Sequence, residues 1–242
     1  MNDKSENKKD MQNKPIDLDI LLELGSIGAG HAATSLSELL QEHVAIDVPK
    51  IHVLPPHLLP EFYNKHDAPT TAIYMQLAEA DCDILLMFEV DEARKIAATM
   101  TMAPSTDEVD ATMEASAIQE LANILLGSFL SAISDFTGVN VVLTPPQRMV
   151  DSFDAILDHF VIKQSLISDE VLVFDIRLKR ASSDAKSILM LFPGKELQLL
   201  LVQKSKEVLG LEVEERKGSE MFCPSPMHIA AISDSQSKMN TS

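Results

Sequence analysis

The 242-residue chain is poor in the residues that mark several familiar protein classes. It has no tryptophan, eight glycines and only two cysteines, Cys82 and Cys223, which lie far apart. Two such distant cysteines argue against a disulfide framework and against a zinc-binding cluster. No run of 18 apolar residues occurs, so we expect no membrane-spanning helix and no membrane partner.

Basic residues are also scarce, since 20 Lys and Arg face 37 Asp and Glu and leave a net charge of -17. Nucleic-acid binding needs clustered Lys and Arg, so a nucleic-acid partner is not expected. An acidic surface fits a partner with a basic rim, and it serves solubility equally well. The polar start of the chain lacks the apolar core of a signal peptide, which makes the cytoplasm the default compartment.

What the chain does have is a hydrophobic content of 45%, enough for one sizeable core. We expect a disordered polar lead-in over residues 1–15, one globular domain over residues 16–209, and a polar tail over residues 210–242.

Residues 113–137 have the apolar period of an amphipathic helix. The opposite face carries the polar and small residues Ser116, Glu120, Asn123, Gly127, Ser131 and Ser134. Glu120 and Asn123 are three positions apart, so an acid and an amide lie side by side on the helix surface. Gly127 is in line with them, and its cost in a helix, roughly 1 kcal/mol relative to alanine, is acceptable where another backbone approaches closely.

Residues 17–41 form a second such stretch despite three glycines, with Asp19, Glu23 and Ser26 on its polar face. The run GSIGAG within it has neither the preceding strand nor the Lys-Ser/Thr ending of a phosphate-binding loop. We therefore interpret its glycines as sites of tight helix packing.

The remaining segments predict strands and shorter helices. In the first half we expect a strand segment over residues 43–55 with a break at Pro49, and a loop over 55–69 with room for a short helical turn. A hairpin over 70–90, a helix over 91–102 and a linker over 103–110 follow. In the second half we expect a segment like 43–55 over residues 139–151, a short helix followed by a strand over 155–168, a hairpin over 170–194 and a closing helix over 195–209.

This order is an internal repeat of two halves, about 17–105 and 113–205. Four residues, Asp19, Glu23, Ser26 and Pro49, correspond at an offset of 97 to Ser116, Glu120, Asn123 and Pro146. We predict an α/β (α+β) fold with pseudo-twofold symmetry, in which the strands of both halves form one sheet and the two long helices pack alongside. Their polar stripes would then lie on the same outer surface.

A single Glu-x-x-Asn pair on a helix is usually no more than a solvated face. The two halves, however, keep a glutamate at the same helical site, Glu23 and Glu120, with a proline at the same distance beyond. This recurrence favours a function, because neutral divergence usually changes a solvated face first. The histidines show no metal-ligand spacing with acids or cysteines, and neither a Gly-x-Ser-x-Gly elbow nor a cysteine–histidine pattern is present.

The spacing Ser116-x3-Glu120-x2-Asn123-x22-Pro146 resembles the signature of the CheC / CheX / FliY phosphatases of chemotaxis. The stretch LGSIGAGHAATSLS is similar to the first helix of the same family, and the resemblance covers roughly residues 17–205. The arrangement of two such helices in one chain is most similar to the CheC type.

The resemblance implies hydrolysis of the aspartyl phosphate of phosphorylated CheY, a receiver domain that supplies its own Mg²⁺ and lysine, so no cofactor of the chain's own is expected. Asn123 would orient the attacking water, Glu120 would pair with the receiver lysine, and Gly127 would let the helix approach closely. In the first half, Ser26 replaces the amide, which implies a weak or inactive second site although Asp19, Glu23 and Pro49 remain.

The alternative function is a non-enzymatic adaptor that senses phosphorylated CheY and regulates the CheD receptor deamidase. Residues 91–100 are its candidate contact surface. A structural part of the flagellar switch is less favoured, because FliY would need a further C-terminal domain. The repeat already supplies a pseudo-dimer, so we expect a monomer.

Overall fold

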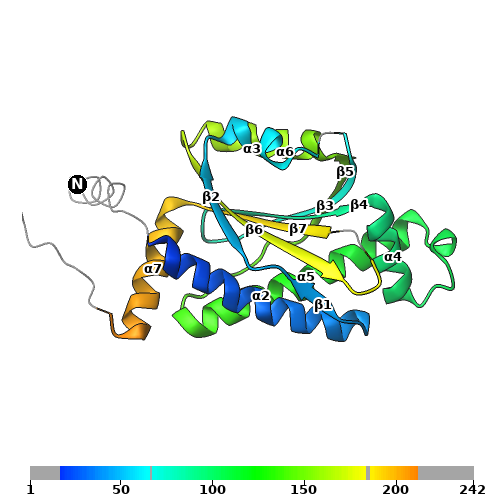
Figure 1. Ribbon diagram of the computed structural model, residues 1–242, viewed down its shortest axis with the longest axis horizontal. Coiled ribbons are helices and arrows are strands. Elements are labelled where there is room, and N and C mark those ends of the chain that lie inside the picture. Colours follow the sequence, from blue (N-terminus) through cyan, green and yellow to red (C-terminus); the bar gives the residue numbers. More distant parts are fainter. Residues whose placement is uncertain (1–16, 66, 184–185, 212–242) are drawn as a thin grey trace, which may run out of the picture. The chain divides into compact units, whose positions relative to one another are not determined.

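The computed structural model describes residues 17–65, 67–183 and 186–211. The predicted lead-in over residues 1–15 and the predicted tail beyond Leu211 lie outside these residues. The described part of the chain forms a seven-stranded antiparallel sheet with helices on both of its faces (Figure 1).

The sheet has the strand order β1-β6-β7-β4-β3-β5, and β2 also pairs with β6. The strand bounds are β1 Val44–Ile46, β2 Lys50–Leu54, β3 Pro69–Gln76, β4 Cys82–Glu89, β5 Gln147–Ser152, β6 Val171–Arg180 and β7 Lys186–Pro193. Both predicted hairpins are present, as β3–β4 and β6–β7.

The strand pairing carries the pseudo-twofold symmetry predicted from the repeat. The centre of the sheet is the antiparallel pair β4–β7, with one strand from each half. On either side, β2 of the first half pairs with β6 of the second, and β5 of the second half pairs with β3 of the first. Each half therefore supplies an outer strand to the hairpin of the other half.

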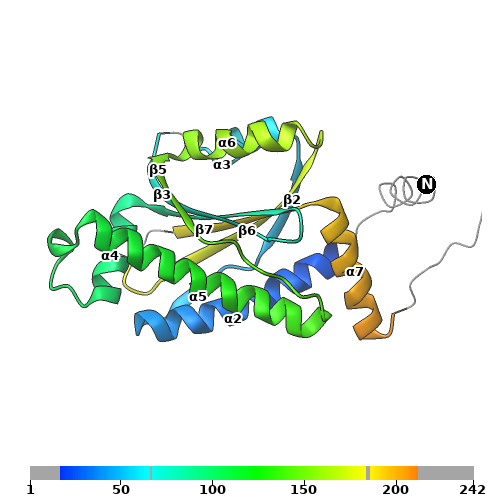
Figure 2. The same ribbon diagram turned by 180° about the vertical axis from the view of Figure 1, so that it is seen from behind.

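The helices form a layer on each side of this sheet. The bounds are α2 Leu18–Leu40, α3 Leu59–Tyr63, α4 Val90–Thr101, α5 Ala111–Thr137, α6 Phe153–Ser165 and α7 Lys195–Leu209, with 3-10 turns η1 Pro56–Leu58 and η2 Thr106–Glu108. The long helices α2 and α5 run antiparallel to each other along one face, while α3 and α6 cover the opposite face (Figures 1 and 2).

Strand β4 shows why the sheet is covered on both sides. Its run of apolar residues sends Ile84 and Leu86 into the core beneath α2 and α5, and sends Leu85 and Met87 into the core beneath α3 and α6. Alternate residues of a strand point to opposite faces, so a strand with an unbroken apolar run such as residues 84–88 needs a cover on each face.

Two of the three glycines of α2 lie at tight packing contacts, as the sequence predicts, whereas Gly30 is exposed and a Cβ on it would meet no atom within 4 Å. A Cβ atom on Gly28 would come within 2.8 Å of the Phe129 ring of α5, and one on Gly25 would come within 3.2 Å of the Phe174 ring of β6. The hydroxyls of Ser35 on α2 and Ser128 on α5 add a hydrogen bond of 2.6 Å between the helices.

Two sequence predictions in the second half are wrong in part. Residues 155–168 do not contain a strand, because α6 continues to Ser165. Its buried residues recur with a helical period, and Ser152 caps the helix by accepting a hydrogen bond from the Ala155 amide. The parallel between residues 139–151 and 43–55 is also incomplete: before β5 only an isolated bridge between Leu143 and Leu77 stands where β1 has its strand.

Among the described residues, α5 is the one helix whose length and apolar composition would suffice to cross a membrane. In the fold, 56% of its apolar window is buried within the protein. A core helix has these properties too, so α5 is explained by its place against the sheet.

Candidate functional site

The predicted site of the second half lies on the exposed face of α5. Ser116, Glu120, Asn123 and Gly127 are all exposed, while the residues on the other side of the helix are buried against the sheet. Three- and four-residue steps bring successive side chains to one helix face, which places the acid and the amide next to each other. Asp110 fixes the start of the helix, because its carboxylate accepts hydrogen bonds of 2.8 Å from the Thr112 and Met113 amides.

Glu120 and Asn123 keep their hydrogen-bonding groups free. Within the described part of the chain, neither side chain makes a hydrogen bond or an ion pair. Their backbone is nevertheless held firmly, since Leu121 and Ala122 between them are fully buried. A free amide and a free carboxylate on a fixed backbone are available to an external partner.

The motif proline of the second half lies close to the same helix. The Gln119 side chain donates a hydrogen bond of 3.1 Å to the Pro146 carbonyl, directly before strand β5 begins at Gln147. In the first half, buried Pro49 lies next to α2, with its Cβ 3.6 Å from the position of a Cβ on Gly25. The 22 residues between Asn123 and Pro146, and between Ser26 and Pro49, therefore span the rest of the helix and the segment that brings the proline back beside it.

The corresponding face of α2 differs at the amide position. Asp19 and Glu23 are exposed, but Ser26 is only partly exposed, and its hydroxyl donates a hydrogen bond of 2.9 Å to the Leu22 carbonyl within the helix. This serine therefore directs its proton to its own backbone, whereas Asn123 directs both an N–H and a C=O outward.

The two motif faces lie toward opposite ends of the helix pair. Each occupies the N-terminal half of its helix, and α2 and α5 run in opposite directions along the sheet (Figure 2). The repeat thus produces two separate surface sites.

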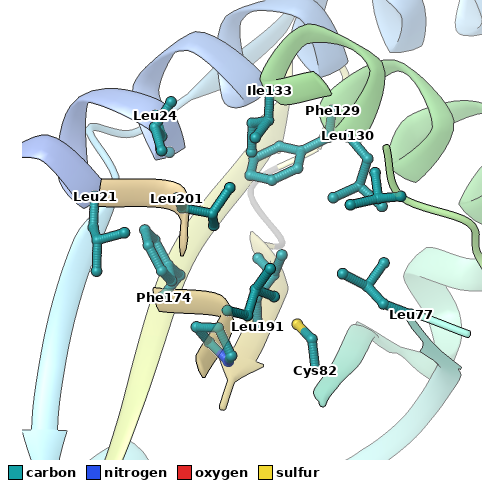
Figure 3. Close-up of a pocket in the computed structure, with 14 residues that line it drawn as sticks. Leu21, Leu24, Leu77, Cys82, Phe129, Leu130, Ile133, Phe174, Leu191 and Leu201 are labelled. Atoms are coloured by element: carbon teal, nitrogen blue, oxygen red, sulfur yellow. The ribbon is translucent and has the colours of Figure 1, made fainter. Parts of the chain in front are cut away.

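One hollow in this region is unrelated to either motif. A cavity of about 40 Å³ lies beneath α2, α5 and α7, and Figure 3 shows leucine, isoleucine and phenylalanine side chains directed into it. No carboxylate, amide or imidazole group belongs to its lining. Cys82 borders the cavity, and burial raises the pKa of its thiol far above the ordinary value, so this cysteine is unsuited to act as a nucleophile.

A buried carboxylate that the sequence analysis did not single out lies on the other side of the sheet. Asp83 of β4 is fully buried and accepts hydrogen bonds of 2.7 Å from the Lys163 ammonium, 2.8 Å from the Tyr74 hydroxyl, 2.9 Å from Gln76 and 3.0 Å from Gln164. This network attaches α6 to the sheet. An acid inside the apolar run CDILLMF is the sequence signal that could have revealed it.

No group of three or more His, Cys, Asp or Glu side chains in the described ranges could hold a metal ion. The expectation that the chain has no cofactor of its own stays a prediction.

Comparison with known proteins agrees with this geometry. The sequence model of the CheC-like family matches residues 16–53 and 113–150, two stretches that each contain one long helix and its proline. CheY-P phosphatase CheC of Bacillus subtilis is 30% identical over 163 residues, which are 65% of this chain and 78% of that protein. The chain belongs to the CheC-like family.

Other relatives of this CheC-like chain include the flagellar motor switch phosphatase FliY of B. subtilis, with 27% identity over 223 residues, 86% of this chain and 56% of FliY. Putative CheY-P phosphatase CheC1 of Halobacterium salinarum is 25% identical over 176 residues, which are 72% of this chain and 88% of that protein.

Among solved structures, Thermotoga maritima FliY aligns with a TM-score of 0.63 at 20% identity, over 78% of this chain and 96% of that one. The FliM middle domain of H. pylori shares the fold as well, with a TM-score of 0.55 at 9% identity, over 77% and 97% of the two chains.

Proposed function

We propose that this CheC-like protein hydrolyses the aspartyl phosphate of a phosphorylated CheY-type receiver, chiefly through the α5 face. The observation that carries the proposal is the unpartnered pair of Glu120 and Asn123 on an exposed, firmly packed helix. The relatives named CheY-P phosphatase supply the substrate class.

An acyl phosphate already bound in a receiver needs little covalent chemistry from its phosphatase. The rate then depends on placing a water in line with the phosphorus, and positioning of this kind is the main contribution a protein makes to phosphoryl transfer. The Asn123 amide can accept a hydrogen bond from that water and donate one to a phosphoryl oxygen, and it does not titrate. Asn123 is therefore the catalytic residue of this proposal.

Glu120 serves to dock the receiver. Its carboxylate is a single negative charge one helical turn from the amide, and it complements the lysine of a receiver active site. Gly127 lies further along the same face and leaves space there, since a Cβ on it would meet no atom within 4 Å. Ser116 is exposed one turn before Glu120.

The α2 face is a weak or inactive second site in this proposal. Glu23 remains able to attract a receiver lysine, but the hydroxyl of Ser26 is shorter than an amide and bonds to the Leu22 carbonyl. The partner brings Mg²⁺ with its own active site, and the cytoplasm is where such a receiver would be met. A monomer suffices, because both helix faces belong to one chain.

The test is phosphate release from a phosphorylated CheY-type receiver, with and without the protein. The wild type should accelerate release over the receiver's spontaneous rate, and Asn123→Ala should lower the turnover number by on the order of 100-fold. Ser131→Ala is the matched control, because Ser131 is exposed two turns further along the same helix face and should have wild-type activity.

An adaptor that only senses the phosphorylated receiver would behave differently. Phosphate release would then be the same for the wild type, for Asn123→Ala and for the receiver alone, and this outcome would refute the phosphatase proposal. In the phosphatase proposal, Asn123→Ala should lose turnover but still bind a CheD-type deamidase, because the amide is needed only for hydrolysis.

A further inference from the structure

The surface of the protein is hollowed directly beside Glu120. An open depression is lined by Met100 and Thr101 at the end of α4 and by Thr112, Met113, Ser116, Ala117 and Glu120 on α5. Ser116 and Glu120 belong to the motif face. A partner that brings a cation to the Glu120 carboxylate must therefore also cover this depression, which we call the methionine depression.

The floor and the rim of the methionine depression differ in polarity. Met100 and Met113 are half-buried and pack on a small apolar cluster that includes buried Ala117. The rim carries three hydroxyl groups, and the Glu120 carboxylate is the one charged group among the lining residues. An apolar floor inside a polar rim is the arrangement found at energetically important points of protein interfaces.

A second observation in favour of a binding surface concerns Met102, which follows the rim residue Thr101. Its side chain is 90% exposed, and its backbone has a φ of 55°, in the left-handed region. Glycine or asparagine normally ends a helix in this conformation, and the other two non-glycine residues of the described chain with positive φ are the polar Gln41 and Asn64. Neither solvation nor the helix end favours methionine here, whereas a flexible, polarisable side chain suits an adaptable binding surface.

The corresponding corner beside the α2 motif face has ion pairs next to exposed apolar side chains such as Val208 and Leu209. There α7 meets the start of α2, and Lys206 forms an ion pair of 3.1 Å with Asp17. Lys204 and Glu207 form a second pair of 2.7 Å, and the helix ends at Gly210 with a φ of 65°. The methionines thus lie beside the helix that carries the amide, and the ion pairs lie beside the helix that lacks it.

We propose that the methionine depression receives an apolar side chain of the phosphorylated receiver, next to the lysine that Glu120 binds. The contact selects receivers with an apolar residue beside that lysine, because it adds to the affinity of those receivers alone. Met100 and Met113, which line the depression, and Met102, which follows the lining residue Thr101 in the chain, are then specificity-determining residues. The inference rests on the proposed function, because it takes the receiver to be the partner on Glu120.

The test combines binding and turnover for two variants with intact folds. Met102→Gly removes the side chain and suits the left-handed backbone, and Met113→Gln keeps the length and helix preference of the residue while making it polar. Each should raise the KM for the phosphorylated receiver by about fivefold and leave kcat unchanged, as expected when part of an apolar contact is lost. Leu209→Ala is the control, since Leu209 is 54% exposed at the other corner, and its KM should be that of the wild type.

Binding of a receiver locked in its phosphorylated form with beryllium fluoride provides an arm that needs no hydrolysis. The same two variants should weaken this binding by about fivefold. This expectation holds even if the wild type releases no phosphate, because a failure of phosphate release would count against the proposed function and not against this inference. Wild-type KM and wild-type affinity in both variants would overturn the inference. It would also be overturned if the variants changed only the self-association of the protein, because the occupant would then be a second copy.

Discussion

The two long helices show how far the surface residues of two copies of one framework can diverge. Helices α2 and α5 occupy equivalent places along the sheet and expose an acid at the same site, Glu23 and Glu120. On α5 the neighbouring amide of Asn123 is free, while on α2 the hydroxyl of Ser26 is bonded to the Leu22 carbonyl. The fold preserves the place of a site, and the surface side chains decide whether chemistry remains there.

The largest expected effect is a difference in kcat/KM between substitutions of Glu120 and of Glu23. Glu120→Ala should lower kcat/KM for phosphate release by on the order of 100-fold, because a docked receiver lysine would be left without its counter-charge. Glu23→Ala should change kcat/KM by less than about twofold. Steady-state assays of both variants check the comparison, and equal losses would mean that both helix faces dock the substrate productively.

A stability difference between the halves should come next. Asp83 in β4 aligns in the repeat with Ser187 in β7, and only Asp83 holds a network to α6. Asp83→Ala should lower the free energy of unfolding by about 2–3 kcal/mol, since Tyr74 loses its acceptor and Lys163 loses its counter-charge. Ser187→Ala should cost less than about 1 kcal/mol, and urea denaturation measures both.

Asp83→Asn sharpens this second comparison. An amide of the same shape keeps an acceptor for Tyr74 but loses the charge that pairs with Lys163, so its free energy of unfolding should lie between those of the wild type and Asp83→Ala. If all three proteins unfolded at the same urea concentration, the network would contribute nothing to stability.

The smallest effect tests whether the first site lacks only its amide. In the wild-type background, Ser26→Asn should raise turnover by at most about twofold, because the second half already works and distant sites act independently. In the Asn123→Ala background, the same substitution should restore phosphate release that stands clearly above the spontaneous rate. No recovery would show that the α2 face lacks more than the amide.

The sequence was sufficient to predict the parts of the fold that depend on periodicity. Both long helices, both hairpins and the single shared sheet follow from apolar spacing and from the repeat, and the structure confirms them. The exposure of Glu120 and Asn123 also follows, because the residues between them, such as Leu121, must face the core.

Other features depend on tertiary contacts that spacing cannot supply. The sequence predicts a short helix and then a strand over residues 155–168, whereas the helix α6 continues to Ser165 because its buried residues Phe153, Ile156 and Phe160 pack against the sheet with a helical period. The methionine depression arises where α4 meets α5, so Met100 and Met113 become neighbours only after the chain has folded. The partners of Asp83 likewise come from two other elements of the fold, β3 and α6.

The exchange of outer strands between the halves limits how this protein can change over time. Because β2 borders the hairpin of the second half and β5 borders that of the first, deleting either half would strip the other of a strand. A lineage that no longer needs one site can therefore discard the site's surface residues but must retain its scaffold. In the proposed function the α2 face is such an inactive copy, whose scaffold must stay for the sake of the other half. A single substitution, Ser26→Asn, would give it the acid and amide pair of the α5 face.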